Sequence, residues 1–149
     1  MNALPGVCVL DASVVIKLFV REPGSEKVMS LLWQPNSDPV SVLLVPDLLF
    51  VECANILWKK VRRESYPIGI AKRNLAELKE LVLSATPSSD LMERALEIAC
   101  AHGVTAYDAC YVALSEAAGA PLMTADRQLA ATLSGSPFDV LLLSELGAG

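Results

Sequence analysis

The stretch VCVLDASVVIKLFV (residues 7–20) decides the fold of this chain. Its first four residues are apolar and partly β-branched and end at Asp11, which predicts a short buried strand over residues 7–10. The residues from 13 to 20 predict a helix that follows almost at once. A buried strand followed by a helix is typical of an α/β fold with a parallel sheet.

The rest of the chain continues this alternation. Further buried strands are expected over residues 40–45, 122–124 and 140–143. Helices are expected over residues 25–33, 47–64, 68–83, 91–101, 106–118 and 127–133, and a turn at 86–90. The pattern predicts one α/β domain over residues 1–149, with a central, mostly parallel β-sheet and helices on both faces.

Composition narrows the class of protein. A chain of 149 residues with 53% hydrophobic residues and a mean hydropathy of +0.44 is long and apolar enough for one well-packed core. No apolar run approaches the roughly 18 residues of a membrane span, and the N-terminus lacks a basic leader, so we expect a soluble cytoplasmic protein without membrane contact. The four cysteines form no Cys-x-x-Cys pair and His102 is the only histidine, which argues against zinc and favours reduced core thiols.

Charge is distributed unevenly along the chain. The net charge is −5, yet residues 59–79 hold seven basic and two acidic side chains, a local charge of +5. The remaining five basic and fifteen acidic residues give −10. A basic segment beside an acidic, metal-binding cleft suits a metal-dependent nuclease, and an ordinary solvated helix face is the alternative. In the nuclease reading, the nucleic-acid backbone would be bound by Lys59, Lys60, Arg62 and Arg63.

Four carboxylates end or interrupt apolar segments. They are Asp11, Glu52, Asp108 and Asp126. An ionised carboxylate is costly to bury alone, and a shared divalent cation would offset that cost for all four. Asp11 and Asp126 each follow a predicted strand, and the carboxyl ends of parallel strands meet at one edge of the sheet, where ligands bind. Oxygen ligands without a His or Cys cluster select Mg²⁺ or Mn²⁺, which activate water and stabilise phosphoryl charge.

Each acid also has a purely structural interpretation. Asp11 and Asp126 could cap the helices that follow them. Glu52 could belong to a solvent-facing stripe with Asn55 and Lys59. Asp108 could stabilise the dipole of its helix from the first turn. The joint placement of the four acids at strand ends and helix starts favours the metal site.

Four motifs give the chain a resemblance to a known family. They are VLDAS (residues 9–13), PDLLFVECAN (46–55), TAYDACYVALSE (105–116) and PLMTAD (121–126). In order and spacing they resemble the motifs of PIN-domain nucleases, and the compact size resembles the VapC toxins of toxin–antitoxin pairs. The resemblance covers nearly the whole chain.

The resemblance implies an endoribonuclease that hydrolyses RNA phosphodiester bonds with Mg²⁺ or Mn²⁺. It also implies a homodimer and a small cognate antitoxin protein that covers the cleft. By matching position, the catalytic and metal-binding quartet is Asp11, Glu52, Asp108 and Asp126. Ser13 and Thr124 would support it as polar neighbours, and Asn55 from slightly farther away.

Two other functions fit parts of the pattern. The first is a Mg²⁺-dependent phosphatase or phosphotransferase on a doubly wound sheet, but haloacid-dehalogenase-like enzymes need an Asp where this chain has Ser13. The second is a non-catalytic PIN-like binding module, against which the presence of all four acids argues. The aromatic residues Trp33, Phe50 and Trp58 could anchor a partner, although core packing is the commoner role of such side chains. Tyr107 and Tyr111 are expected in the core or at its rim.

Overall fold

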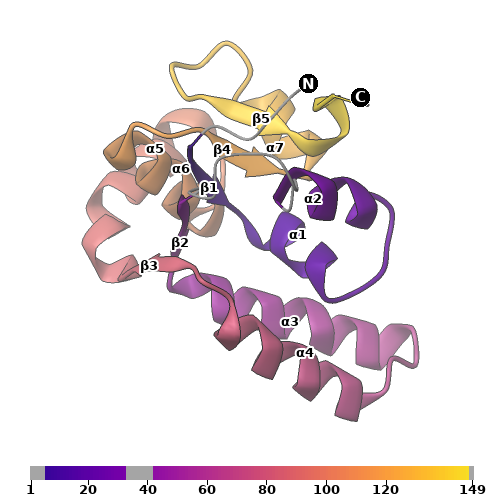
Figure 1. Ribbon diagram of the computed structural model, residues 1–149. Coiled ribbons are helices and arrows are strands. Elements are labelled where there is room, and N and C mark those ends of the chain that lie inside the picture. Colours follow the sequence, from indigo (N-terminus) through magenta and orange to yellow (C-terminus); the bar gives the residue numbers. More distant parts are fainter. Residues whose placement is uncertain (1–5, 33–41, 148–149) are drawn as a thin grey trace.

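The computed structural model describes residues 6–32 and 42–147, which form a parallel sheet covered by helices (Figure 1). The strands are β1 (Val7–Leu10), β2 (Val42–Pro46), β3 (Ser84–Thr86), β4 (Leu122–Thr124) and β5 (Val140–Leu142). The α-helices are α1 (Ala12–Val15), α2 (Ser25–Leu32), α3 (Leu48–Arg63), α4 (Ile68–Glu80), α5 (Met92–His102), α6 (Ala106–Ala118) and α7 (Arg127–Thr132). Short 3-10 helices are η1 (Ile16–Leu18), η2 (Ser88–Leu91) and η3 (Leu143–Glu145). Within the described ranges, no helix is long and apolar enough to cross a membrane.

The strand order places β1 at the centre of the sheet. The order is β3-β2-β1-β4-β5, and all four neighbouring pairs are parallel. From β1 the chain first builds outward through β2 and β3, then returns to the other side of β1 for β4 and β5. The order therefore reverses between β1 and β4, which in open α/β sheets is where a ligand crevice forms. Leu10 pairs with Met123, so the two strands end side by side.

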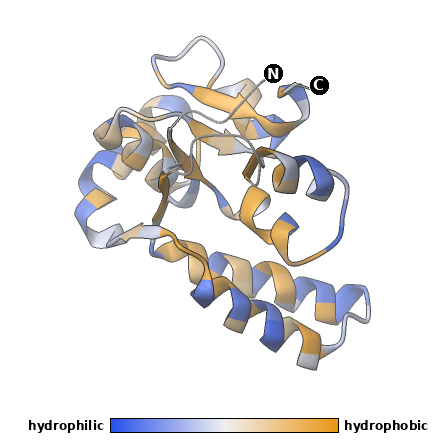
Figure 2. Ribbon diagram, in the orientation of Figure 1, coloured by the Kyte–Doolittle hydropathy of each residue, from blue (hydrophilic) through white to orange (hydrophobic). Residues whose placement is uncertain are grey.

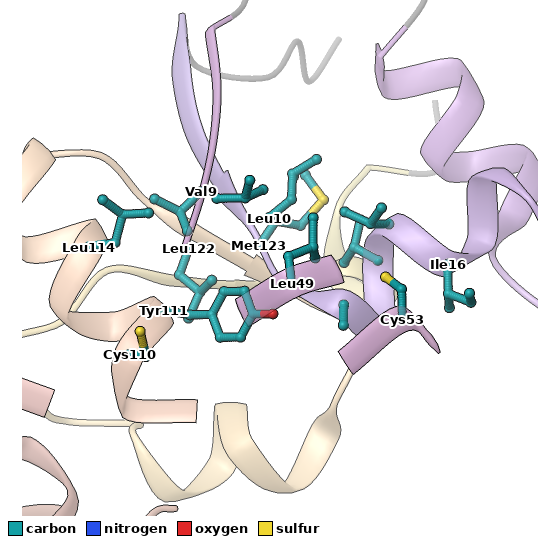
Figure 3. Packing of buried hydrophobic residues seen from close by; sticks show 14 of the residues in the cluster. Val9, Leu10, Ile16, Leu49, Cys53, Cys110, Tyr111, Leu114, Leu122 and Met123 are labelled. Carbon is teal, nitrogen blue, oxygen red and sulfur yellow. The ribbon is translucent and has the colours of Figure 1, made fainter. Parts of the chain in front are cut away.

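The central strand is buried on both faces. Cys8, Val9 and Leu10 are each 0% exposed, which explains why β1 reads as a continuous apolar run rather than as an alternating one. Helix α6 covers the sheet with a buried run from Ala109 to Ser115. Figure 3 shows Tyr111 of this run among side chains of β1, β4 and α3, with its hydroxyl oxygen directed toward α3.

Helices α3 and α4 pack side by side as a separate layer below the rest of the molecule in Figure 1. Helix α3 buries Leu49, Cys53 and Leu57, which are spaced by four residues and so lie on one face. Its last turn is basic, and this end is coloured as hydrophilic in Figure 2. This basic last turn lies at the end of α3 farthest from the sheet.

Three predicted segments differ from the structure. The helix expected over residues 68–83 ends at Glu80, and β3 lies between it and the predicted turn, where no strand was expected. This strand has three residues at the sheet edge, two of them exposed, so it shows no apolar alternation. The helix expected over 13–20 begins earlier, at Ala12, and continues only as η1. Trp33 and the predicted beginning of the second strand lie outside the described residues.

Candidate functional site

Asp11 follows β1 directly and begins α1 as its N-cap. Its Oδ1 accepts hydrogen bonds from the backbone N–H of Val14 at 3.2 Å and from the hydroxyl of Ser13 at 2.5 Å. The side chain is buried, with 6% of the residue exposed. Burial raises the pKa of Asp11 from 3.8 to about 6, because the loss of hydration outweighs the hydrogen bonds that favour the ionised form. The cap predicted as an alternative is present, and it fixes this carboxylate at the sheet edge.

Two hydroxyl groups join the ends of β1 and β4. The Ser13 Oγ accepts from the backbone N–H of Ala125 at 2.9 Å and lies 3.4 Å from the Thr124 Oγ1. The Thr124 Oγ1 in turn accepts from the backbone N–H of Asp126 at 3.0 Å. Ser13 and Thr124 thus hold the two aspartate-bearing segments next to each other.

Asp126 begins α7 in the same way that Asp11 begins α1. Its Oδ1 accepts from the backbone N–H groups of Gln128 at 2.9 Å and Leu129 at 3.1 Å. Unlike Asp11, Asp126 is exposed. A capping carboxylate uses one oxygen for the helix and keeps the other available for a ligand.

Glu52 reaches the site from the second turn of α3. It is half-buried, and its Oε1 accepts a 2.5 Å hydrogen bond from the Tyr111 hydroxyl of α6. Burial raises the pKa of Glu52, the Tyr111 hydrogen bond acts in the opposite direction, and the charge of Asp108 raises the pKa further. The hydrogen bond gives Glu52 a partner in the core, since Tyr111 is 1% exposed.

Asp108 lies in the first turn of α6, whose N-cap is Thr105. The Thr105 Oγ1 accepts from the backbone N–H of Asp108 at 3.1 Å. A helix N-terminus favours a carboxylate, yet the pKa of Asp108 is raised, first by burial and then by the charge of Asp126. Asp108 also raises the pKa values of Asp11 and Glu52. It is therefore the electrostatic link between the other three acids.

The donor chemistry of this group fits a hard divalent cation. Glu52 and Asp126 each use one carboxylate oxygen in the hydrogen bonds above, and the other oxygen of each has no such bond among the described residues. Mutual repulsion and lost hydration both favour binding of a positive ion. In residues 6–32 and 42–147, no three His, Cys, Asp or Glu side chains stand as a ready-formed ligand set. Binding would thus require the free oxygens to turn toward one another.

The helix that carries Glu52 is anchored by Ser88, a residue that the sequence did not single out. Asp47 precedes α3 but makes no side-chain cap to it. Instead, the Ser88 Oγ accepts from the backbone N–H of Leu48 at 3.0 Å and donates to the Asp47 Oδ1 at 2.6 Å. The backbone N–H of Ser88 also donates to Asp47 at 2.9 Å. This Asp47–Ser88 clasp ties the start of α3 to the segment after β3.

The predicted RNA-binding residues lie in different surroundings. Lys59 and Arg63 are exposed. Lys60 is only 16% exposed at its side chain, and its Nζ lies 3.4 Å from carboxylate oxygens of both Glu22 and Glu64. Arg62 places its guanidinium carbon 5.3 Å from the centre of the Trp58 ring. The free positive charge of this end of α3 therefore comes from residues other than Lys60.

Two other residues of the second motif differ in burial. Asn55 lies three residues beyond Glu52 on α3 and is exposed. Phe50 is half-buried and packs against the core. Tyr111 is buried, as expected, but sequence reasoning missed its hydrogen bond to Glu52, although its spacing of three from Asp108 placed it on the same helix face.

Known proteins share both the sequence pattern and the fold. A family model described as the PIN domain matches residues 8–132. Ribonuclease VapC3 of Pyrobaculum aerophilum is 40% identical over 124 residues, which cover 82% of this chain and 91% of that protein.

Two solved structures extend the comparison. The structure of PAE2754 from Pyrobaculum aerophilum matches with a TM-score of 0.65 at 25% identity, covering 94% of this chain and 87% of that chain. A toxin–antitoxin complex from Klebsiella pneumoniae has a chain that matches with a TM-score of 0.64 at 15% identity, covering 91% and 97%. At that identity the second match shows a common fold only.

Proposed function

The chain belongs to the PIN-domain family, and on that premise we propose that it is a VapC-like endoribonuclease that hydrolyses RNA phosphodiester bonds. The observation that carries the proposal is the charge coupling of Asp108 to each of the other three acids, near the edge where β1 and β4 end. A relative that is 40% identical is named a ribonuclease, which supports the same chemistry.

In this proposal the four acids hold Mg²⁺ or Mn²⁺, and the remaining residues of the site position them. When bound, the ion supplies charge neutralisation at the phosphoryl group and makes water more acidic. Ser13 and Thr124 keep the segments of Asp11 and Asp126 at a fixed spacing. Tyr111 directs Glu52 toward the other acids by its hydrogen bond.

The proton released by the attacking water has to be accepted by the chain. His102 packs its ring edgewise against Phe138, with 5.3 Å between the ring centres, and does not belong to the group of four acids. A carboxylate of the site is therefore the proposed proton acceptor, and a raised pKa suits this role better than an ordinary one.

The proposed partners follow from the family. We propose a small antitoxin protein that covers the acidic edge, since the chain resembles VapC toxins and shares its fold with a chain of a toxin–antitoxin complex. A second copy of the chain is the other proposed partner. We also propose that the protein acts in the cytoplasm.

A cleavage experiment tests this function. Purified protein would be incubated with a mixture of transfer and ribosomal RNA in Mg²⁺, in Mn²⁺ and in chelator, beside Asp126→Asn. We expect fragments with either metal and none in chelator or with the variant. Hydrolysis of a simple phosphomonoester without RNA cleavage would instead support a phosphatase. Absence of both activities, together with absence of metal binding, would support a non-catalytic module.

A further inference from the structure

Five exposed side chains form a stripe along helix α3. In chain order they are Asp47, which precedes the helix with helical backbone angles, and then Val51, Asn55, Trp58 and Arg62. Successive members are four, four, three and four residues apart, so all five lie on one side of the helix. The stripe exposes two large hydrophobic side chains, Val51 at 67% and Trp58 at 52%. Exposed apolar side chains gathered on one helix side mark an interaction surface.

The two ends of the stripe carry opposite charges. Hydrogen bonds from the Ser88 hydroxyl and backbone N–H to the Asp47 Oδ1 lower the pKa of Asp47, so this carboxylate is ionised. Its second oxygen has no hydrogen bond among the described residues. At the other end, the guanidinium of Arg62 lies 5.3 Å from the centre of the Trp58 ring, within the range of a cation–π contact. The stripe therefore has an acid at one end, a base at the other and no net charge.

Such a stripe is complementary to a copy of itself that runs in the opposite direction. With Asn55 opposite Asn55 of the partner subunit, Val51 comes level with Trp58 of the partner subunit, and Asp47 with Arg62 of the partner subunit. Each pair then matches to within about 1.5 Å along the helix axis, the rise of one residue. The two central amide groups can donate to and accept from each other. A two-fold axis through this point repeats every contact, as in an isologous dimer.

From this self-complementarity we propose that a second copy of the chain docks on the α3 stripe, with the two helices antiparallel. The inference deepens the proposed function, on which the choice of a second copy as partner rests, and it assigns that partner a surface and a direction. Glu52 is turned about 100° from Val51 around the helix, so it lies outside the contact between the two helices. A helix of a different protein is the competing occupant, but it would have to reproduce the same order of charges.

Disulfide cross-linking tests the centre and the direction of the contact. Asn55→Cys would be combined with Cys100→Ser, because Cys100 is exposed whereas the other three cysteines are buried. Mild oxidation should join two chains of Asn55→Cys, since a disulfide requires Cα atoms within roughly 7 Å of each other. Val51→Cys in the same background is the matched control. In the antiparallel arrangement its two copies are about 12 Å apart along the axis, so it should give no cross-linked dimer on non-reducing electrophoresis.

Sedimentation of the full chain tests the energetics of the same contact. We expect wild type to dimerise and Trp58→Ala to raise the dissociation constant of the dimer at least about tenfold, as for a buried tryptophan anchor. Arg62→Glu should also raise it, because it places a second carboxylate opposite Asp47. Arg73→Glu makes the same charge change at an exposed position of α4 and should leave the dissociation constant unchanged.

Three results would overturn the inference. A wild-type protein that cleaves RNA but remains monomeric would keep the proposed nuclease function and leave the stripe to a different protein. Equal dissociation constants for wild type, Trp58→Ala and Arg62→Glu would place the dimer contact elsewhere. Cross-linking of Val51→Cys as readily as Asn55→Cys would exclude the antiparallel direction. In contrast, a dimer that shows all the expected effects but cleaves no RNA would support the inference and remove the proposed nuclease function.

Discussion

At Asp11, burial and hydrogen bonding act in opposite directions on one carboxylate. The effect of burial on the pKa is the larger one, so the pKa rises to about 6 even though the side chain accepts hydrogen bonds from Ser13 and Val14. The same carboxylate caps α1, so the structural and the proposed catalytic roles of Asp11 are compatible. Asp126 combines the two roles in the same way at α7. In each case the cap fixes the position that a metal ligand would need.

Replacing Asp11 with Asn should make the metal-free protein more stable at neutral pH. The raised pKa means that the folded state binds a proton more tightly than the unfolded state, so the free energy of unfolding falls as pH rises from 3.8 through about 6. Asn cannot ionise, so Asp11→Asn avoids this fall in the free energy of unfolding. Its side-chain oxygen can still cap α1. In chelator at pH 7, Asp11→Asn should be more stable by on the order of 2 kcal/mol in urea unfolding. A difference that stays the same at pH 4 and pH 7 would contradict this account.

Replacing Tyr111 with Phe should alter how RNA cleavage depends on pH. The hydroxyl stabilises the ionised form of Glu52, so its loss should raise the pKa of Glu52. The acidic limb of the kcat/KM profile should move to higher pH, and the free energy of unfolding should fall by about 1–2 kcal/mol. Tyr107→Phe is the matched control, because Tyr107 is 66% exposed. Superimposable pH profiles for Tyr111→Phe and wild type would rule out this role of Tyr111.

At the scale of elements, the site depends on how each helix begins. Asp11, Thr105 and Asp126 cap their own helices through their side chains. Helix α3 differs because its cap comes from Ser88, 40 residues farther along the chain. Local patterns predicted the caps by Asp11 and Asp126, since each residue precedes its own helix. They could not predict the fourth, because it depends on how β3 lies beside β2.

Removing the Asp47–Ser88 clasp should loosen the start of α3. Ser88→Ala removes the acceptor for the Leu48 N–H, and we expect a loss of about 1 kcal/mol in unfolding free energy. Cleavage should also slow, because Glu52 lies one turn farther along α3. Ser89→Ala at the exposed neighbouring position should change neither quantity. Equal effects of the two substitutions, measured by urea unfolding and initial cleavage rates, would show that the clasp does not position α3.

The basic residues of α3 should differ in their effect on the salt dependence of RNA binding. Arg63 is exposed, so Arg63→Gln should lower the slope of log affinity against log salt by about 0.7, the value for one single-strand phosphate contact. Lys60 is already paired with Glu22 and Glu64, so Lys60→Gln should leave the slope unchanged and reduce stability instead. An equal reduction of the slope by both substitutions would show that Lys60 contacts RNA and breaks its ion pairs.

At the scale of the whole molecule, the parallel sheet brings together acids that are far apart in the sequence. The expected position of Asp11 and Asp126 past two strand ends is confirmed, and these strands are neighbours. Apolar runs were sufficient to predict four of the strands and most helix bounds, because those elements are buried. Strand β3 was missed because an exposed edge strand of three residues has no apolar pattern. The Tyr111–Glu52 contact was missed because it joins two elements 59 residues apart.

Titration of the metal-free protein with Mn²⁺ tests most directly whether the four acids share one cation. Wild type would be compared by calorimetry and thermal unfolding with Asp11→Asn, Glu52→Gln, Asp108→Asn and Asp126→Asn, and with Glu93→Gln as an exposed acidic control. We predict that Mn²⁺ raises the Tm of wild type and the control equally, and that each of the four site variants binds at least about tenfold more weakly. Equal Mn²⁺ affinities and equal Tm increases across all six proteins would contradict a shared metal site.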